Sequence, residues 1–582
     1  MDSRTAAHAL TQIGALLEAK GEQRFKARAY AGAARALVAL DTDDLAPLLK
    51  SGELAAASGI GPATLSVIRE LVETGESSYL NRLREGMPEG MLDLMRVPGL
   101  SIQKVQLIHD ALGVQTLEDL ERVAQNGQLA ELPKFGKKTA EKILKGIEIL
   151  RRSGHLERFP QAAVEAHVLV SNVEKHPDVT RADVAGSIRR HNEVVANIDI
   201  VAECSADPEQ VADSFARSPG VVQAKKGHDA GSVSIRFVDG THLHMHCVER
   251  SDYPVALWRA TGSSAHVEEM TVLADKRGYE IKGNALVKKG KRIPIPSEDA
   301  LFAALDIAPI PPEMREGMGE IEAAARRELP SLVTFDDLRG VLHCHSSYSD
   351  GGATIEEMAN AARERGWSYI GITDHSESAF YAGGLKRDKL ARQHDEIDRL
   401  NADMKDFRIL KGIEADILAD GRIDYDSDTL DRFDYVIGSI HSRFSMEGDA
   451  MTKRVLTAMD DPHLTILAHP TGRLLLSREP YAIDIEAVLE KAAEVGVAVE
   501  LNADPHRLDL DWRYCRQAKE LGVTIEIGPD AHSTAGLDNV HFGIGMARKA
   551  WLEATEILNT RSADDVLAFA QNRRAGQTRS AR

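Results

Sequence analysis

The sequence predicts a multidomain α/β protein in which helical domains come first, an α+β region follows, and a distorted (β/α)7 barrel comes last. Three observations support this fold class. The chain has 582 residues, too many for a single hydrophobic core. Turns that contain glycine and open helices recur in the first third. After residue 335, seven short apolar runs each end in a histidine or an acidic residue and alternate with helix-like stretches.

Composition limits the possible function classes. Hydrophobic residues make up 43% and charged residues 28% of the chain, as in ordinary globular proteins. No apolar run reaches the roughly 18 residues needed to cross a bilayer, and the charged segment 1–20 lacks the apolar core of a secretion signal. We therefore expect a cytoplasmic protein without a membrane partner. Four cysteines without paired spacing argue against a disulfide framework or a zinc finger.

The net charge of −19 opposes nucleic-acid binding by the chain as a whole, because phosphate contacts depend on Lys and Arg. Much of the acidity lies in the C-terminal half, however, where bound divalent cations would offset it. Basic residues cluster nearer the N-terminus, and local patches decide the partner. DNA therefore stays a candidate partner.

Three glycine turns precede helix-like stretches in the first third, at residues 58–64, 97–101 and 132–140. Such a turn presents backbone N–H groups to a phosphate without side-chain obstruction. A single one is usually plain turn chemistry, whereas three in succession indicate a function. They resemble helix-hairpin-helix elements, which grip the DNA backbone regardless of its sequence. The resemblance implies DNA contacts at these residues: Gly59, Gly61, Gly99, Gly136, Lys137 and Lys138.

Segment 25–30, followed by the first hairpin, resembles the small N-terminal domain of family X DNA polymerases. We expect this domain over residues 1–90, and a fingers-like domain with the other two hairpins over residues 91–155. In lyase-competent members, a lysine on the helix after the first hairpin forms a Schiff base with an abasic sugar. Val67 stands at the matching position, so lyase activity through that residue is not expected.

Two motifs in the middle third, Ala185–Arg190 and Ala260–Ser263, match the nucleotidyltransferase palm of the same family. The resemblance implies that the Gly186–Ser187 turn and Arg190 hold the triphosphate of an incoming nucleotide. It also implies that Thr261, Gly262 and Ser263 are remnants of the nucleotide-binding site. It covers nearly the whole chain and is strongest with the bacterial type of family X polymerase, which carries a C-terminal polymerase-and-histidinol-phosphatase (PHP) domain. It places the palm at 156–250, the thumb at 251–320 and the PHP domain at 335–575.

The catalytic carboxylates of such a palm are largely missing. Nucleotidyl transfer uses carboxylates that hold two metal ions, and the family supplies them as an Asp-x-Asp pair and a third Asp. The matching positions are Asn197, Asp199 and His244. Either Asp199, His244 and His246 form an altered metal site of softer character, or the palm is a folded relic that still binds DNA. We favour the relic and expect polymerase activity to be impaired or lost, which leaves Mg²⁺ or Mn²⁺ binding at the palm open.

The last domain alternates its strand-like runs with helix-like stretches such as 354–364 and 485–494. Strand followed by helix, repeated, predicts a parallel barrel, and such barrels place chemistry at the carboxyl ends of their strands. Ligand-type side chains stand at those ends: His343, His345, Asp350, His375, Glu414, His441, His469, Asp530 and His532.

Two imidazoles two residues apart, on His343 and His345, lie on one side of a strand and can reach one ion. The nine residues match the PHP pattern, which implies three divalent ions. The implied ligand sets are His343, His345, Glu414 and Asp530; Glu414, His441 and His469; and Asp350, His375 and His532. Mixed nitrogen and oxygen donors suit Mn²⁺, Zn²⁺ or Fe²⁺ better than Mg²⁺. The expected catalytic residues are Glu414, His343 and Asp530.

The predicted function is metal-dependent 3′–5′ exonuclease or phosphodiesterase action on gapped, nicked or 3′-ended DNA in base excision repair, by a monomer. Lys386 and Arg473 are candidate phosphate contacts, although surface charge explains each equally well. Two alternatives stay open: a bifunctional DNA polymerase and exonuclease, and a small-molecule phosphomonoesterase in which the N-terminal modules are only scaffold. The intact set of nine ligands makes a non-enzymatic DNA-binding factor improbable.

Overall fold

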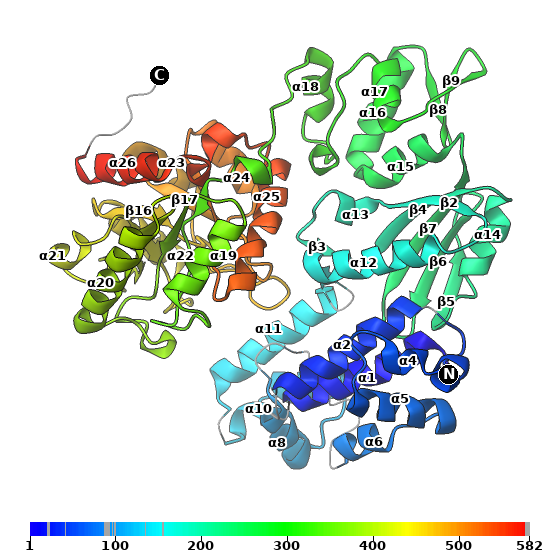
Figure 1. Cartoon of the computed structure of the whole chain (residues 1–582), viewed down its shortest axis with the longest axis horizontal. Coiled ribbons are helices and arrows are strands. Elements are labelled where there is room, and N and C mark those ends of the chain that lie inside the picture. Colours follow the sequence, from blue (N-terminus) through cyan, green and yellow to red (C-terminus); the bar gives the residue numbers. More distant parts are fainter. Residues whose placement is uncertain are drawn as a thin grey trace. The chain divides into compact units, whose positions relative to one another are not determined.

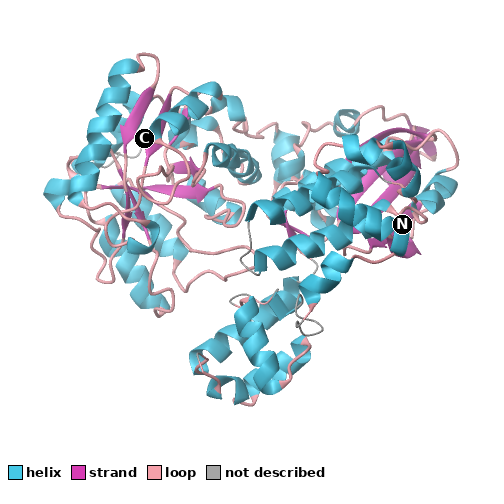
Figure 2. Ribbon diagram, turned by 60° about the horizontal axis from the view of Figure 1, so that its bottom comes forward, coloured by secondary structure: helices cyan, strands magenta, loops and turns pink. Residues whose placement is uncertain are grey.

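The computed structural model describes residues 1–19, 24–40, 42–85, 94–95, 97, 100–133, 135–153 and 156–576. The chain forms two compact units (Figures 1 and 2), made of Met1–Arg189 with Val194–Pro309, and of Arg190–Glu193 with Ile310–Arg582. Within the described ranges, no helix has both the length and the apolar character needed to span a membrane.

Two helical groups with separate cores begin the first unit. Helix α1 (Ser3–Ala19) packs along α2 (Arg24–Leu40), because Leu10, Ile13 and Leu17 recur at helical spacing and are buried. The other helices of the first group are α3 (Ala46–Ser51), α4 (Glu53–Ala56), α5 (Pro62–Thr74) and α6 (Ser78–Arg84). Those of the second group are α8 (Ile102–Leu112), α9 (Leu117–Gln125), α10 (Gln128–Glu131) and α11 (Lys137–Ser153).

A five-stranded mixed sheet follows, in the order β2-β4-β7-β6-β5. Its strands are β2 (Val179–Val184), β4 (Ile198–Cys204), β5 (Val221–Lys226), β6 (Ser232–Phe237) and β7 (His242–Glu249). Strands β4 and β7 pair in parallel with Asp199 opposite His244. Two residues that are distant in the sequence therefore meet on neighbouring strands.

Helices and two small sheets, with the orders β1-β3 and β10-β9-β8, complete this unit. The helices are α12 (Phe159–Val173), α13 (Gly186–Arg189), α14 (Pro208–Phe215), α15 (Tyr253–Thr261), α16 (Ser264–Lys276) and α17 (Glu298–Ala304). The small strands are β1 (Glu157–Arg158), β3 (Val194–Val195), β8 (Glu280–Lys282), β9 (Ala285–Lys288) and β10 (Lys291–Ile293). Helix α15 packs against β4, and its Trp258 is fully buried. Burial of this large side chain anchors the end of α15, where the second palm-like motif lies.

Eight parallel strand segments form the barrel of the second unit, in two sheets with the orders β11-β12-β13 and β14-β15-β16-β17-β18. Two bridges join the sheets: Cys344↔Ala531 links the segments that follow β11 and β18, and His375↔Glu414 links the segment that follows β12 to β14. The ring of strands is therefore closed. The strands are β11 (Gly340–Val341), β12 (Tyr369–Ile372), β13 (Arg408–Lys411), β14 (Glu414–Asp416), β15 (Val436–Ser439), β16 (Leu464–Leu467), β17 (Ala498–Asn502) and β18 (Ile525–Gly528).

Helices surround these strands (Figure 1). They are α19 (Ile355–Glu364), α20 (Arg387–Asp403), α21 (Ser427–Leu430), α22 (Gly448–Met459), α23 (Ile485–Val495), α24 (Trp512–Glu520), α25 (Val540–Lys549) and α26 (Ala563–Arg574). Helix α18 (Glu320–Arg326) precedes the barrel strands in the chain and belongs to the same unit. Helices α19 and α23 lie within a residue of the expected stretches because Thr354 and Asp484 cap them. The Thr354 hydroxyl accepts from the Glu357 N–H (3.2 Å), and the Asp484 carboxylate accepts from the Ala487 N–H (3.1 Å).

The apolar run at 410–414, expected as one strand, is divided between β13 and β14. Gly412 lies at the break, where its N–H donates to the Ile372 carbonyl at 2.9 Å. A Cβ atom on Gly412 would lie 2.5 Å from Thr373 Cγ2, so only glycine allows this close approach. The seven expected runs therefore become eight strand segments, and the barrel is distorted at this point.

The barrel interior leaves no room for a side chain at Gly371. A Cβ atom there would lie 1.8 Å from Tyr435 Oη, and that hydroxyl donates to the Leu342 carbonyl. We expect Gly371→Ala to lower the free energy of unfolding by about 1–3 kcal/mol through overpacking. Calorimetry should show a lower melting temperature for the barrel transition.

The control for this prediction is Gly448→Ala. The added methyl group would lie 3.6 Å from Ala482 Cβ, an ordinary contact, so the melting temperature should change little. An unchanged melting temperature for Gly371→Ala would contradict the packing described for the barrel interior.

Candidate metal centre

The structure brings all nine predicted metal ligands to one end of the barrel. His343 and His345 follow β11, His375 follows β12, Glu414 begins β14, His441 follows β15, His469 follows β16, and Asp530 and His532 follow β18, with Asp350 in the loop before α19. Carboxyl ends of parallel strands meet at one face of a barrel. The local reason for the convergence is therefore strand direction.

One oxygen of Glu414 faces three imidazoles. Its Oε2 lies 2.9 Å from His375 Nδ1, 3.5 Å from His343 Nε2 and 3.6 Å from His345 Nε2. Asp530 Oδ1 lies 3.3 Å from His345 Nε2 and 3.7 Å from His343 Nε2. Two carboxylates and three imidazoles thus face a common volume. The side chains of Glu414 and His343 are buried.

The other oxygen of Glu414 faces two further imidazoles. Its Oε1 lies 3.1 Å from His469 Nε2 and 3.3 Å from His441 Nε2. The carboxylate of Glu414 therefore stands between two groups of imidazoles, which is the position expected for a residue that bridges two ions.

Asp350 gathers the remaining ligands. Its carboxylate oxygens lie 3.5 Å from His532 Nε2, 3.6 Å from His375 Nε2 and 3.9 Å from His345 Nδ1. The donor atoms form three sets, and within each set all the atoms lie within 4.8 Å of one another. The sets are His345 with Asp350, His375 and His532; His343 with His345 and Asp530; and His375 with Glu414 and His441. The sequence predicted that His345 and His375 would each contribute to one metal site. In the structure, each of the two histidines belongs to two sets of donor atoms.

Several buried polar atoms of this site make no hydrogen bond. They include His343 Nε2, both ring nitrogens of His345, and Glu414 Oε2. A buried polar atom without a partner is costly, and most such atoms in folded proteins are paired. These atoms are of the types that bind transition metals, so the residues fit divalent metal ions.

Electrostatics prepare two of the ligands for metal binding. Burial by itself would raise the pKa of the Glu414 carboxyl, but His375, His441 and His343 lower it well below its usual range. Burial and the neighbouring His375 lower the pKa of His345 to about 3. Ionised carboxylates and neutral imidazoles are the forms that bind metal ions.

Two carboxylates that the sequence analysis did not assign orient these ligands. Glu500 Oε1 lies 2.5 Å from His343 Nδ1, and Glu500 Oε2 accepts from the His469 N–H at 2.6 Å. Asp416 Oδ1 lies 2.8 Å from His441 Nδ1. A carboxylate that accepts from Nδ1–H leaves the Nε2 lone pair for a metal ion. Glu500 is the last residue of the apolar run 497–500, one of the seven runs. This position at the end of a run could have indicated a role for Glu500 at the metal centre.

Of the two candidate phosphate contacts, one is paired within the protein and the other is exposed. Arg473 Nη1 pairs with Asp511 at 2.7 Å, and its Nε donates to the Arg507 carbonyl at 3.0 Å. The loop after β17 therefore occupies this guanidinium. Lys386 is exposed at the start of α20. The basic group beside the ligands is instead Arg507, whose Nε lies 3.6 Å from Asp530 Oδ2.

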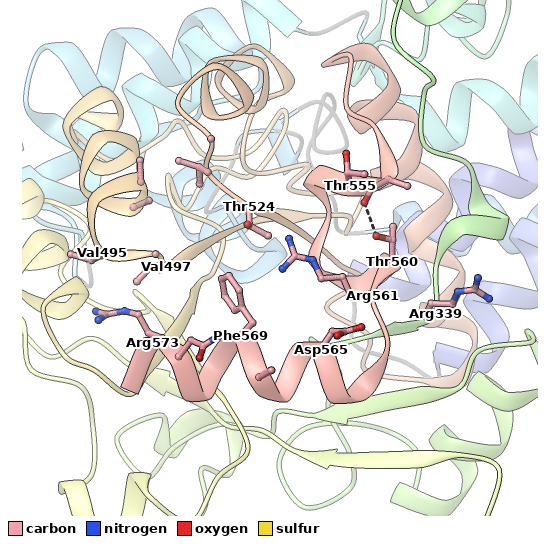
Figure 3. A pocket seen from close by; sticks show the side chains of 18 of the residues that line it. Arg339, Val495, Val497, Thr524, Thr555, Thr560, Arg561, Asp565, Phe569 and Arg573 are labelled. Atoms are coloured by element: carbon pink, nitrogen blue, oxygen red, sulfur yellow. Dashed lines mark hydrogen bonds between the residues drawn. The ribbon is translucent and has the colours of Figure 1, made fainter. Parts of the chain in front are cut away.

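A pocket of about 660 Å³ lies elsewhere in the barrel unit. Arg339, Val497 and Thr524 line it and precede β11, β17 and β18, so it opens at the amino ends of the strands, the end opposite the ligands. Figure 3 shows Arg561 and Phe569 facing this pocket. In such barrels the amino end serves stability rather than chemistry.

The palm residues come together, but they satisfy one another. Asn197 Nδ2 donates to Asp199 Oδ2 at 2.8 Å and lies 3.2 Å from His244 Nδ1. Asp199 Oδ1 lies 3.3 Å from His244 Nδ1 and 3.9 Å from His246 Nε2. Burial would raise the pKa of Asp199, but the neighbouring imidazoles of His244 and His246 lower it.

Of the predicted nucleotide-binding residues, Gly186 lies directly against Asp199. Gly186 opens α13 at φ +61°, and a Cβ atom there would lie 1.9 Å from Asp199 Oδ2. Ser187 lies in the same helix, and Gly262 follows α15. The Thr261 hydroxyl accepts from Arg189 at 2.7 Å. Ser263 caps α16, and its hydroxyl accepts from the His266 N–H at 3.1 Å. Arg190 belongs to the second unit, where it pairs with Glu316 at 2.9 Å.

The first helix-hairpin-helix turn has the backbone that its glycines predict. Gly59 has φ +92°, and a Cβ atom there would lie 3.3 Å from the Gly32 carbonyl oxygen. Gly61 caps α5, and its N–H donates to the Thr64 hydroxyl at 3.0 Å. Val67 is buried in the core of this helical group, so it has a packing role.

In the third turn, Gly136 directly precedes α11, and Lys137 and Lys138 are exposed in the first turn of that helix. Exposed lysines at a helix N-terminus favour phosphate contacts. Gly99 of the second turn lies outside the described residues.

Four family descriptions match parts of the chain. They are a helix-hairpin-helix domain at residues 1–77, a SAM-like helix-hairpin-helix tandem at 91–148, a DNA polymerase beta thumb at 256–316, and a PHP domain at 342–504. The order of these matches agrees with the expected order of helical, polymerase and barrel domains.

Relatives fall into two groups. The chain is 37% identical over 565 residues to the DNA polymerase/3′-5′ exonuclease PolX of Bacillus subtilis (strain 168), covering 96% of this chain and 98% of that protein. It is 30% identical over 256 residues to a probable phosphatase of Caldanaerobacter subterraneus subsp. tengcongensis, covering 41% of this chain and 93% of that protein. A probable phosphatase of Syntrophotalea carbinolica is 28% identical over 244 residues, covering 39% and 94%.

Fold and site together define a polymerase-type scaffold joined to a metal-dependent hydrolase domain. The match to the Bacillus subtilis protein extends over nearly the full length of both chains. The chain belongs to the family X DNA polymerases that carry a C-terminal PHP domain.

Glu500 provides a test of ligand orientation. We expect Glu500→Gln to weaken metal binding by about 10- to 100-fold, because removal of a carboxylate that orients a ligating histidine has effects of this size. Competition with a chromogenic chelator measures the affinity, and the visible spectrum of the Co²⁺-substituted protein should change because the ligand geometry changes.

The matched control is Glu526→Gln. Glu526 pairs with Glu500 in the strand register, and burial together with Glu500 raises its pKa well above the usual range. A neutral amide therefore replaces a protonated acid, and metal affinity should stay within a few-fold of wild type. Equal losses in both variants would indicate general damage to the barrel rather than loss of orientation.

Proposed function

We propose that the protein is a metal-dependent 3′–5′ exonuclease that acts on DNA through its barrel, and that its polymerase activity is impaired or lost. One contrast carries the proposal. Nine ligand-type side chains converge at the barrel, whereas the palm keeps one carboxylate, Asp199, of the three that nucleotidyl transfer uses. The Bacillus subtilis relative is named for both activities, so the contrast decides which of them to expect.

The barrel residues support hydrolysis of a phosphodiester. Divalent ions, when bound, make a hydroxide nucleophile available at neutral pH and neutralise phosphate charge. We infer three ions held by the nine residues, with Mn²⁺, Zn²⁺ or Fe²⁺ favoured by the imidazole donors. Glu414, His343 and Asp530 form the catalytic group of the proposal. Arg507, beside Asp530, would contribute positive charge for the substrate phosphate.

The N-terminal helices support DNA as the substrate. Two helix-hairpin-helix matches and a polymerase thumb precede the barrel, and such modules bind the DNA backbone. Gly59 and Gly136 would offer backbone N–H groups to phosphates, and Lys137 and Lys138 would offer positive charge. Gly61, whose N–H donates to the Thr64 hydroxyl, would shape the first turn. Gapped, nicked or 3′-ended DNA is the substrate class that fits these modules.

Local contacts at the palm support the loss of polymerase activity. Asn197 directs an amide N–H, which cannot bind a cation, at Asp199. Glu316 neutralises Arg190, the residue expected to hold the triphosphate. The palm therefore keeps one of the three carboxylates that the metal pair uses.

A phosphomonoesterase is the second candidate. The two relatives that match about 40% of this chain over nearly their whole length are both named probable phosphatases. The discriminating experiment compares a single-stranded oligonucleotide bearing a 3′-hydroxyl with histidinol phosphate. Release of mononucleotides supports the exonuclease. Turnover of histidinol phosphate without nucleotide release would support the phosphomonoesterase.

His343→Ala tests the barrel as the nuclease. We expect degradation of a labelled 3′ end to fall by at least about 100-fold, because a catalytic metal ion contributes several kcal/mol to the transition state. The Asp199→Ala variant, altered only in the palm, should degrade the same substrate at the wild-type rate. Full activity of His343→Ala would contradict the proposal.

Reconstruction of the palm tests the loss of polymerase activity. We expect no primer extension from wild type with Mg²⁺ or Mn²⁺, and measurable extension from the double variant Asn197→Asp with His244→Asp, which restores three carboxylates. Each single variant serves as a control and should stay inactive. Extension by wild type that Asp199→Ala abolishes would instead establish the bifunctional alternative.

A further inference from the structure

An exposed aromatic pair stands beside the metal centre. Phe380 is 85% exposed and Tyr381 is 62% exposed, and both belong to the short 3-10 helix η3 (Phe380–Ala382). The neighbours Ala379 and Ala382 are buried. The loop therefore buries its small side chains and presents its large ones to solvent, which is the reverse of what stability requires.

The loop that carries the pair is firmly built. Ser376 bridges to Leu385, and the Leu385 N–H donates to the His375 carbonyl at 2.9 Å. The Gly384 N–H donates to the Ala379 carbonyl at 3.1 Å. A Cβ atom on Gly384 would lie 2.0 Å from the Ser376 carbonyl oxygen. This backbone holds the aromatic residues in place next to a predicted metal ligand.

Tyr381 lies at the edge of the ligand cluster. Its ring centroid is 6.3 Å from that of His441 and 6.0 Å from that of Phe380. The rings of Tyr381 and Phe380 are nearly perpendicular. The Tyr381 ring therefore lies between a predicted metal ligand and the second exposed aromatic side chain.

We propose that Phe380 and Tyr381 form a stacking subsite for unpaired nucleobases that flank the scissile phosphate of a DNA 3′ end. Nucleobases stack on exposed aromatic side chains whatever their identity, and a base is joined to its own phosphate by a single sugar. A base held at Tyr381 would thus lie beside the metal centre. Bases in a duplex already stack on their neighbours, so the subsite selects single-stranded or frayed ends. The inference rests on the proposed exonuclease function.

The test uses the full-length protein loaded with Mn²⁺ and two labelled single-stranded oligonucleotides. One has a normal 3′ end, and the other carries tetrahydrofuran abasic residues at its last two positions. Phe380→Ala or Tyr381→Ala should lower kcat/KM on the normal end by about 5- to 150-fold and by less than about 2-fold on the abasic end. Tyr381→Phe, which keeps the ring, should rescue most of the loss caused by Tyr381→Ala.

The matched control is Tyr514→Ala, which removes another exposed aromatic of the same unit, on α24; its kcat/KM should equal that of wild type on both substrates. Equal rates for wild type and the alanine variants on the normal end, or equal losses on both ends, would overturn the stacking subsite. An inactive wild type would instead remove the proposed exonuclease function, so the two failures are distinguishable.

Discussion

The buried carboxylate of Glu414 is the interaction on which the site depends. It lies within 3.6 Å of imidazole nitrogens from five histidines, which follow four different strands. An ionised carboxylate without solvent is costly unless opposite charge surrounds it. The imidazoles supply that charge in part, and bound cations would supply the rest. Gly412, which lets the backbone approach Thr373 closely, puts Glu414 at this position.

The same kind of polar cluster has a different character in the palm. Asp199 accepts from Asn197 and lies against His244, so protein groups satisfy it. At the barrel, atoms of His343, His345 and Glu414 stay without hydrogen bonds. Satisfied groups hold a fold together, whereas buried nitrogen and oxygen atoms without hydrogen bonds fit a site that binds a cation. This difference in hydrogen bonding, more than the number of histidines, separates the two sites.

The ligand positions could be predicted because histidines and carboxylates stand at the ends of apolar runs, and parallel strands put those ends together. The distribution of His345 and His375 between donor sets could not, because it depends on distances of a few tenths of an ångström. Glu500 stood at a run end without an assigned role, since its bond to His343 crosses 157 residues. Arg473 and Arg507 could not be ranked, because only the loop path decides which guanidinium is occupied. The exposure of Phe380 and Tyr381 had no sequence signal.

By itself the sequence determined the domain order, the barrel class and the nine residues at its carboxyl end, because strand periodicity and residue type are local properties of the chain. It also predicted Asn197 and His244 at two positions where the resemblance expects carboxylates. Only the tertiary structure decided which donors share a volume, which carboxylates orient the histidines, where the barrel is distorted and which aromatic residues face solvent. Those features depend on contacts between residues far apart in the chain, and such contacts follow from packing rather than from local pattern.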